Sequence, residues 1–312
     1  MRVAILPTGR MEWHALPRAL ARLFPGHTFY CLPTEALIRS HLERFPYDGV
    51  TSVALQASHE ETPPESAREL VARAAQEALG DRKQAPADLV VIVDDVELPN
   101  MAQPDRIVRV MHHAAQAHLE QLSAHAHLQD LTRDALKTRV SFHLISPMVE
   151  AWLFADPEAL ERAGVADPTT RVCFAETTNP EQFSTDDPAY LSAVEGDCPR
   201  WASRGRKKKD RPKWLGGLDR ARHPKGYLQW LCIAPDDKCC TTYSETHHGA
   251  EALAHISWAR LLGRPAAQMG YLRALIEDIA YCLDTAPTTP TSGTASPLTG
   301  RLGDPAFVLR NL

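Results

Sequence analysis

Three carboxylates directly follow an apolar run in the sequence. Residues 88–97 read Asp-Leu-Val-Val-Ile-Val-Asp-Asp-Val-Glu, so that five apolar residues lead into Asp94, Asp95 and Glu97. An apolar run of this length is typical of a strand buried on both faces. Because ligand and metal sites of open parallel sheets lie at the carboxyl ends of such strands, the carboxylates indicate a site for a divalent cation. The alternative is a strand that leaves the core into a solvated turn.

A basic segment lies in the second half of the chain. Residues 204–213 contain seven basic residues, between Trp201 and Trp214. The seven are Arg204, Arg206, Lys207, Lys208, Lys209, Arg211 and Lys213. A basic loop with aromatic neighbours suits a phosphate backbone, because neutralised phosphates release counterions and aromatic faces stack on unpaired bases. Binding by this loop alone would be independent of sequence, and the alternative is a solvated surface loop.

One lysine stands where a helix is expected to begin, in the segment His-Pro-Lys-Gly-Tyr-Leu (223–228). At this place Lys225 could reach an anionic ligand. From spacing alone, an ordinary exposed lysine is an equal alternative.

The composition is that of a globular protein. A chain of 312 residues with 44% apolar content can bury one α/β domain together with a large insertion or a second lobe. The net charge of -5 gives no general attraction for nucleic acid, so such binding would come from a local patch. No apolar run approaches the roughly 18 residues that span a bilayer, so we expect no membrane contact and a cytoplasmic location. The seven cysteines have no regular framework and are expected to be reduced.

Strands and helices alternate through the first half of the chain. Apolar runs and alternation predict strands at 2–6, 28–32, 88–94 and 139–145, with 50–55 as a further strand or a turn. Helical spacing predicts helices at 12–24, 35–44, 64–79, 104–127 and 148–154. This order favours a doubly wound α/β fold, a Rossmann-like parallel sheet flanked by helices.

The regular hydrophobic periodicity of the sequence is lost after this core. We expect a core over 1–163, a loop-rich insertion over 164–223, helices over 224–283 that complete the domain, and a flexible tail over 284–312. The helices of the third part are predicted at 224–231, 248–262 and 265–283.

Four segments in a fixed order resemble a bacterial Toprim-like family that is often encoded beside ATPases of the RecF and SMC type. They are residues 9–17, the strand into 94–97, residues 147–160 and residues 223–228. The resemblance spans roughly residues 1–260, and the most distinctive part is Glu-Ala-Trp-Leu-Phe-Ala-Asp. It implies a compact Rossmann-like sheet. In that family a glutamate after the first strand and an Asp-x-Asp-like pair after a later strand hold Mg²⁺ for phosphodiester chemistry.

The resemblance carries over residue by residue with two departures. The family's first motif is similar to Glu-Gly-x-x-Glu, and here Thr8 replaces its first glutamate, while Gly9 and Glu12 match. The second motif can be read from Asp94 or as Asp95-Val-Glu97. Two further acids, Glu150 and Asp156, also match the family. Asp156 precedes Pro157 and can equally cap the next helix.

The resemblance therefore implies a nuclease that depends on Mg²⁺ or Mn²⁺. Asp94, Asp95 and Glu97 would be metal ligands, Glu12 a ligand or general base, and Lys225 a stabiliser of phosphate charge. The partners would be nucleic acid, with DNA favoured over RNA, and an ATPase of the RecF or SMC type, in phage defence or DNA repair. The alternative is a Toprim-fold binding or regulatory subunit of such an ATPase complex that has lost catalysis with the change to Thr8.

Overall fold

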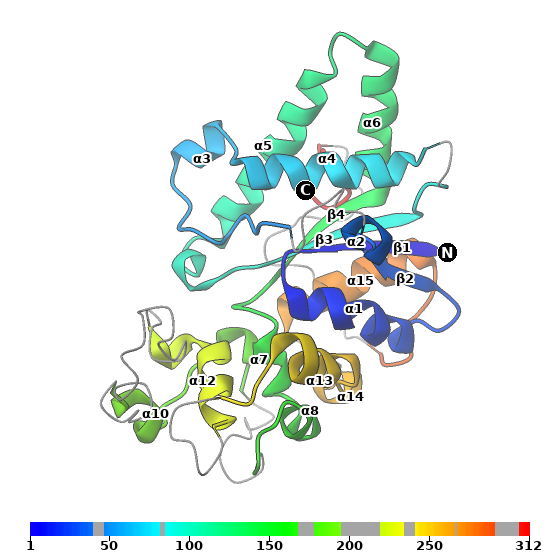
Figure 1. Cartoon of the computed structure of the whole chain (residues 1–312). Helices are drawn as coiled ribbons and strands as arrows, with labels where there is room; N and C mark the ends of the chain where they lie inside the picture. The colour runs from blue at the N-terminus through cyan, green and yellow to red at the C-terminus, as the bar shows by residue number, and fades with distance from the viewer. Residues whose placement is uncertain are drawn as a thin grey trace.

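The computed structural model describes residues 1–39, 47–81, 85–167, 178–194, 219–233, 241–265, 267–290 and 306–312. Over these residues the chain forms a four-stranded parallel sheet with helices on both faces (Figure 1). The strands are β1 (Arg2–Pro7), β2 (Thr28–Cys31), β3 (Leu89–Asp95) and β4 (Val140–Ile145), in the order β2-β1-β3-β4. The predicted α/β class is therefore confirmed.

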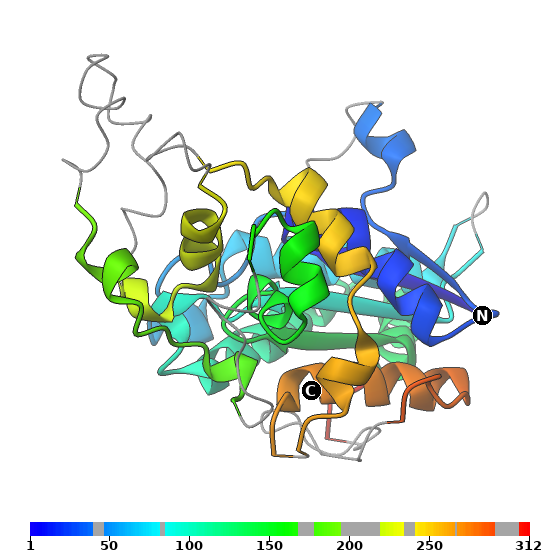
Figure 2. The same ribbon diagram turned by 90° about the horizontal axis from the view of Figure 1, so that it is seen from below.

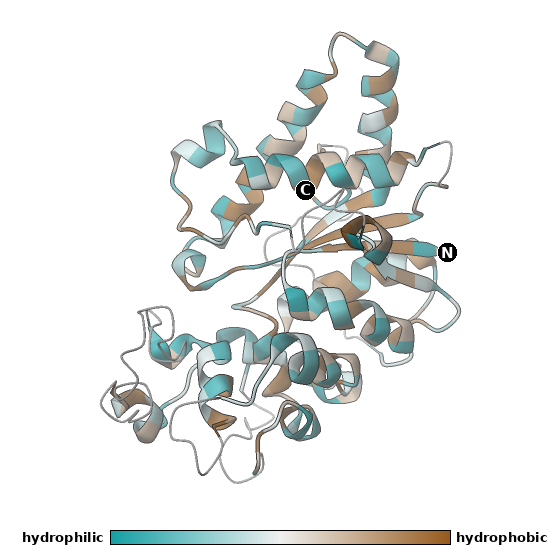
Figure 3. Cartoon of the chain, viewed as in Figure 1, coloured by the Kyte–Doolittle hydropathy of each residue, from teal (hydrophilic) through white to brown (hydrophobic). Residues whose placement is uncertain are grey.

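The apolar run of β3 is buried on both faces of the sheet. Val91 and Val93 belong to one hydrophobic core cluster, whereas Val90 and Ile92 belong to another. This is the pattern expected of a central parallel strand. The strands accordingly form a continuous apolar layer between the helices, as the hydropathy colouring in Figure 3 shows.

Helices cover the two faces of the sheet as separate layers (Figure 1). One layer contains α1 (Arg10–Leu23), α13 (Ala250–Ala254) and α15 (Gly270–Leu283), and the other contains α4 (Glu65–Leu79), α5 (Pro104–Gln121) and α6 (Ala126–Arg139). Helix α1 connects β1 to β2 on the first face, and α4 precedes β3 on the second. The winding thus reverses between β1 and β3. In an open α/β sheet, this switch point opens a crevice at the carboxyl ends of the two strands.

The remaining helices and turns of the described residues are short. They are α2 (Glu35–Arg39), α3 (Ser58–Glu61), α7 (Glu150–Leu153), α8 (Pro157–Arg162), α10 (Pro188–Ser192), α12 (Pro224–Leu231) and α14 (Trp258–Leu262), with the 3-10 turns Leu98–Asn100, Pro180–Gln182 and Arg220–Arg222 and the π-helical turn Glu245–Gly249. Figure 2 shows α7, α8, α12 and α13 grouped on the side of the sheet that carries α1. No helix among these described residues is long and apolar enough to cross a membrane.

Two predicted helices are divided in the structure, and the one expected over 248–262 becomes α13 and α14 with the π-helical turn before them. The helix expected over 104–127 ends at Gln121, and a second helix begins at Ala126. The Leu119 carbonyl accepts from the Leu122 N–H at 3.1 Å and from the Gln129 Nε2 at 2.8 Å, which stabilises the break. Residues 50–55 form a turn and loop, the second of the two alternatives expected for this segment. The backbone of this loop is hydrogen-bonded to the Asn100 side chain. Asn100 Oδ1 accepts from the Leu55 N–H at 2.8 Å, and Asn100 Nδ2 donates to the Thr51 carbonyl at 3.0 Å.

The expected flexible tail is wrong for residues 306–312. Val308, Leu309 and Leu312 are buried in the core cluster beside β4. The Asn311 side chain accepts from the Phe142 N–H at 3.0 Å and donates to the Phe142 carbonyl at 2.8 Å. This segment therefore supplies hydrogen-bond partners to Val140 and Phe142 on the outer edge of β4, beside which the described residues form no further strand.

Replacing Asn311 by alanine should destabilise the fold. The change leaves two buried backbone groups of Phe142 without partners, and each such group costs about 1–3 kcal/mol. We expect urea denaturation to show a loss of about 2–4 kcal/mol in the free energy of unfolding. The control, Arg39→Ala, removes an exposed ion pair and should change this value by less than about 0.5 kcal/mol. A loss as small as the control's would contradict the role of Asn311.

Candidate functional site

Four carboxylates from separate parts of the chain gather at the switch point. Glu12 lies in the first turn of α1, Asp95 ends β3, Glu97 follows two residues later, and Glu150 begins α7. Glu12 and Glu150 are each only 3% exposed. A cavity of about 260 Å³ opens beside them, lined by Asp95, Glu97, Met148, Glu150, His223, Lys225, Gly226 and Gln229.

Glycine at position 9 makes room for the Glu12 carboxylate. Gly9 is the residue before α1, and a Cβ built on it would lie 2.1 Å from Glu12 Oε2. No side chain could share this space without moving the carboxylate. The absence of a side chain at position 9 thus has a steric reason in this chain.

Asp94 is tied into the protein itself. Its Oδ1 accepts from the Thr8 hydroxyl at 2.6 Å and from the Asp95 N–H at 3.1 Å, and its Oδ2 accepts from the Val50 N–H at 2.9 Å. The side chain is 2% exposed. Thr8 therefore holds the acid that the sequence predicted as a metal ligand. Burial raises the pKa of Asp94 to about 6, although these hydrogen bonds act in the opposite direction.

The Asp95 carboxylate has fewer hydrogen-bond partners than that of Asp94 among the described residues. Its Oδ1 is buried and has no hydrogen-bond partner among the described residues. Burial, followed by the charges of Glu12, Glu97 and Glu150, raises the pKa of Asp95 well above its ordinary value. A buried acceptor without a donor is costly, so this oxygen favours a proton or a cation beside it.

Glu97 has a strained backbone. Its φ is 57° and its ψ is 149°, a region that glycine adopts and other residues avoid. Hydrogen bonds fix this conformation: the Val96 N–H donates to the Ile145 carbonyl at 2.8 Å, and the Glu97 N–H donates to the Pro147 carbonyl at 3.0 Å. Strain held by its surroundings is concentrated at functional sites, and here it turns a carboxylate towards other carboxylates.

The acids raise one another's pKa values. Burial and then the charge of Glu150 raise the pKa of Glu12 to about 8 and that of Glu97 to about 7. Burial also raises the pKa of Glu150. These groups therefore hold protons at pH values where exposed carboxylates have lost them.

A lysine from α12 partly neutralises the acids. Lys225 Nζ lies 2.8 Å from Glu245 Oε1 and 3.7 Å from Glu150 Oε1. Burial alone would lower the pKa of Lys225, but Glu150 and Glu245 raise it above the ordinary value. The ammonium group is therefore charged in the cavity wall. The adjacent His223 caps α12, since its Nδ1 accepts from the Gly226 N–H at 3.0 Å, and burial lowers its pKa.

The structure brings together most of the predicted site. Glu12, Asp95, Glu97, Glu150 and Lys225 surround one cavity or influence one another there. The basic segment with Arg204, Arg206, Lys207, Lys208, Lys209, Arg211 and Lys213 lies outside the described residues.

Asp156 has a structural role. Its carboxylate accepts from the Glu158 N–H at 3.2 Å, as the predicted helix cap requires, and from the Ser257 N–H at 2.8 Å. It is fully buried and joins α8 to the beginning of α14.

Sequence reasoning missed Glu245. The residue lies in a π-helical turn, and a π-turn inside a helical region often accompanies a functional site. Nothing in the local sequence signals that turn, so the ion pair with Lys225 becomes visible only in the folded chain.

The carboxylates do not form a finished coordination sphere. Within the described part of the chain, no three Asp, Glu, His or Cys side chains are arranged to hold a metal ion as they stand. A cation would therefore require a change of side-chain rotamers.

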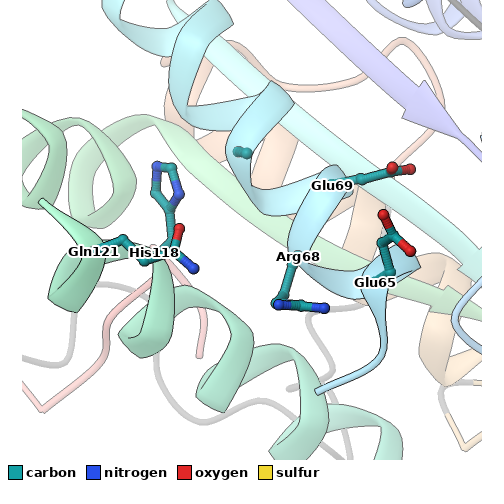
Figure 4. Close-up of a pocket in the computed structure, with 6 residues that line it drawn as sticks. Glu65, Arg68, Glu69, His118 and Gln121 are labelled. Carbon is teal, nitrogen blue, oxygen red and sulfur yellow. The ribbon is translucent and has the colours of Figure 1, made fainter. Parts of the chain in front are cut away.

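A second depression of about 260 Å³ lies between α4 and α5 (Figure 4). Figure 4 shows that Glu65 and Glu69 on α4 lie apart from His118 on α5 and do not converge with it on a common point. Glu65 and Glu69 are exposed. This depression therefore lacks the buried charges that distinguish the cavity beside Glu150.

No protein-family model, curated protein or solved structure matches the chain. The activity of the site must therefore be inferred from its own residues and their surroundings.

Replacing Glu97 by glycine should stabilise the protein in the absence of metal. The change relieves a strained φ and removes one of the mutually repelling acids. We expect the free energy of unfolding to rise by about 1 kcal/mol, because backbone strain of this kind costs about 1–3 kcal/mol and glycine returns part of it as entropy. The variant Glu97→Gln keeps the strain and separates the two effects. Chemical denaturation in EDTA measures both, and a destabilised glycine variant would contradict the strain.

Stability should fall with pH more steeply in the wild type than in Glu12→Gln. The folded-state pKa of Glu12, about 8, is above the ordinary 4.5, so the unfolded chain loses this proton first. The stabilisation is complete below about pH 4.5 and is lost as the pH rises to about 8. Melting temperatures in EDTA across this range test it. Histidines such as His118, whose pKa burial lowers, contribute equally to the pH dependence of both proteins. The difference between the two curves therefore removes their contribution. If the melting temperatures of the two proteins fall in parallel as the pH rises, the raised pKa of Glu12 is contradicted.

Proposed function

We propose that the acids at the switch point hold a divalent cation and that the protein hydrolyses phosphodiesters of nucleic acid. The observation that carries this proposal is the buried Oδ1 of Asp95, which has no hydrogen-bond partner among the described residues and faces the charges of Glu12, Glu97 and Glu150. A cation would supply the missing partner and offset the repulsion.

The donor set fits Mg²⁺ or Mn²⁺. Both ions take oxygen ligands, and Mg²⁺ in phosphoryl-transfer sites is usually bound by one or two carboxylates together with water and substrate phosphate. Glu12, Asp95, Glu97 and Glu150 offer such oxygens at the edge of a cavity of about 260 Å³. Asp94 would remain a second layer that fixes the Asp95 backbone through its hydrogen bond to the Asp95 N–H.

Each residue of the site would have a distinct task. When bound, the cation would polarise the phosphodiester and lower the pKa of an attacking water. Glu12, whose pKa burial raises to about 8, is suited to accept the proton of that water. Lys225 lines the cavity with a charged ammonium group and would stabilise negative charge on the phosphate. The resemblance to Toprim-like proteins and the basic segment 204–213 support nucleic acid as the substrate.

A second function is favoured by the hydrogen bond between Thr8 and Asp94. That bond, with two from backbone N–H groups, occupies the acid that the family pattern uses for metal. A chain with this change could serve as a binding or regulatory subunit of an ATPase complex. In that case nucleic acid would be bound and not cut.

The two functions separate in one experiment. We expect the purified protein to cut labelled plasmid, single-stranded DNA or RNA with Mg²⁺ or Mn²⁺ and not with EDTA. Asp95→Asn and Glu12→Gln should lower the rate at least about 100-fold, the loss typical of a ligand or general base. The matched control is Glu69→Gln, an exposed acid of α4 that should leave the rate unchanged.

Calorimetric titration with Mn²⁺ completes the experiment. Binding to the wild type that is lost in Asp95→Asn supports the metal site even before a substrate is found. Salt-sensitive nucleic-acid binding with neither Mn²⁺ binding nor cleavage would reject the nuclease and favour the binding subunit.

A further inference from the structure

The one lysine described beside the acids has an unequal pair of partners. Its Nζ contacts Glu245 Oε1 at 2.8 Å but is 3.7 Å from Glu150 Oε1. The near partner is the outer one, since the Glu245 side chain is 26% exposed and that of Glu150 is 4% exposed. The ammonium group is thus closer to the half-buried Glu245 than to the buried Glu150 of the cavity wall.

We propose that Lys225 is a built-in counter-ion that takes the place of the divalent cation at Glu150 in the cation-free protein, and that Glu245 is the positioning residue that keeps it beside the cavity when the cation enters. This inference rests on the proposed metal site and concerns its regulation.

Electrostatics explains why a substitute cation is needed. Glu150 is buried next to Glu12 and Glu97, and these acids in their charged forms would destabilise the fold without a counter-ion. A lysine suits this role because its single charge ends a flexible stem. A fixed guanidinium fork would be harder to displace.

Glu245 gives the ammonium group of Lys225 a second carboxylate to contact besides Glu150. It comes from the π-helical turn before α13, whereas Glu150 comes from α7, so the two acids lie on different elements. A cation at Glu150 would repel the ammonium group, and the shorter contact to Glu245 would keep it at the cavity. There it would meet a phosphate that enters with the cation.

The proposal predicts opposite effects of two substitutions on metal affinity. Lys225→Met removes the competitor and should tighten Mn²⁺ binding by at least about fivefold, the lower end of ordinary coupling between sites. Glu245→Gln removes the alternative partner, leaves the ammonium group to Glu150, and should weaken Mn²⁺ binding. In the Lys225→Met background the effect of Glu245→Gln should become smaller, because no lysine is left to redirect.

Calorimetry with Mn²⁺ alone measures these affinities, and circular dichroism in EDTA shows that each variant is folded. The matched control is Arg18→Met, which removes a positive charge from an exposed ion pair with Glu251. It should change Mn²⁺ affinity by less than about twofold, because exposed charges are screened.

Each outcome decides a separate point. Wild-type binding with equal or weaker binding by Lys225→Met would overturn the counter-ion role and leave the metal site in place. If Lys225→Met does not fold, unchanged or tighter binding by Glu245→Gln overturns the role instead. No Mn²⁺ binding by the wild type or any variant would reject the metal site itself.

Discussion

A carboxylate buried at the end of an apolar strand is stable only where donors surround it, and Asp94 meets this condition. Its donors are the Thr8 hydroxyl and the N–H groups of Val50 and Asp95. They come from the link between β1 and α1, from the loop before α3, and from β3 itself. One side chain therefore joins three segments around the switch point, and the places of Glu12 and Asp95 both depend on it.

The neighbouring Asp95 and Glu97 differ from this structural carboxylate. Among the described residues Asp95 has a buried oxygen without a hydrogen-bond partner, and Glu97 has a backbone conformation that glycine would adopt more easily. A sequence selected for stability alone would have removed both features. Local rules broken together at the carboxyl ends of parallel strands are the pattern expected of a functional site, and this supports the proposed cation site.

Periodicity and apolar runs were sufficient to predict the four strands, their α/β class and the place of the acids after β3. Distant contacts were not predictable in this way. The hydrogen bond between Thr8 and Asp94 joins residues 86 positions apart, and the pairing of Lys225 with Glu245 needs a π-helical turn that local propensity does not signal. The prediction of a flexible tail was wrong for residues 306–312 for a related reason. Its Thr, Pro and Ser content resembles disorder, while residues 306–312 are placed by contacts with β4 such as that of Asn311.

The contact between Asn311 and Phe142 also determines how late in synthesis the outer edge of β4 can find its partner. Asn311 and Phe142 are 169 residues apart, and ribosomes add about 5–20 residues per second, so roughly 10–30 s pass between the synthesis of β4 and the arrival of its partner. During this time the outer edge of β4 presents unpaired N–H and C=O groups, which can pair with strands of other chains. The nascent protein therefore has a period of vulnerability to aggregation that the finished fold does not reveal.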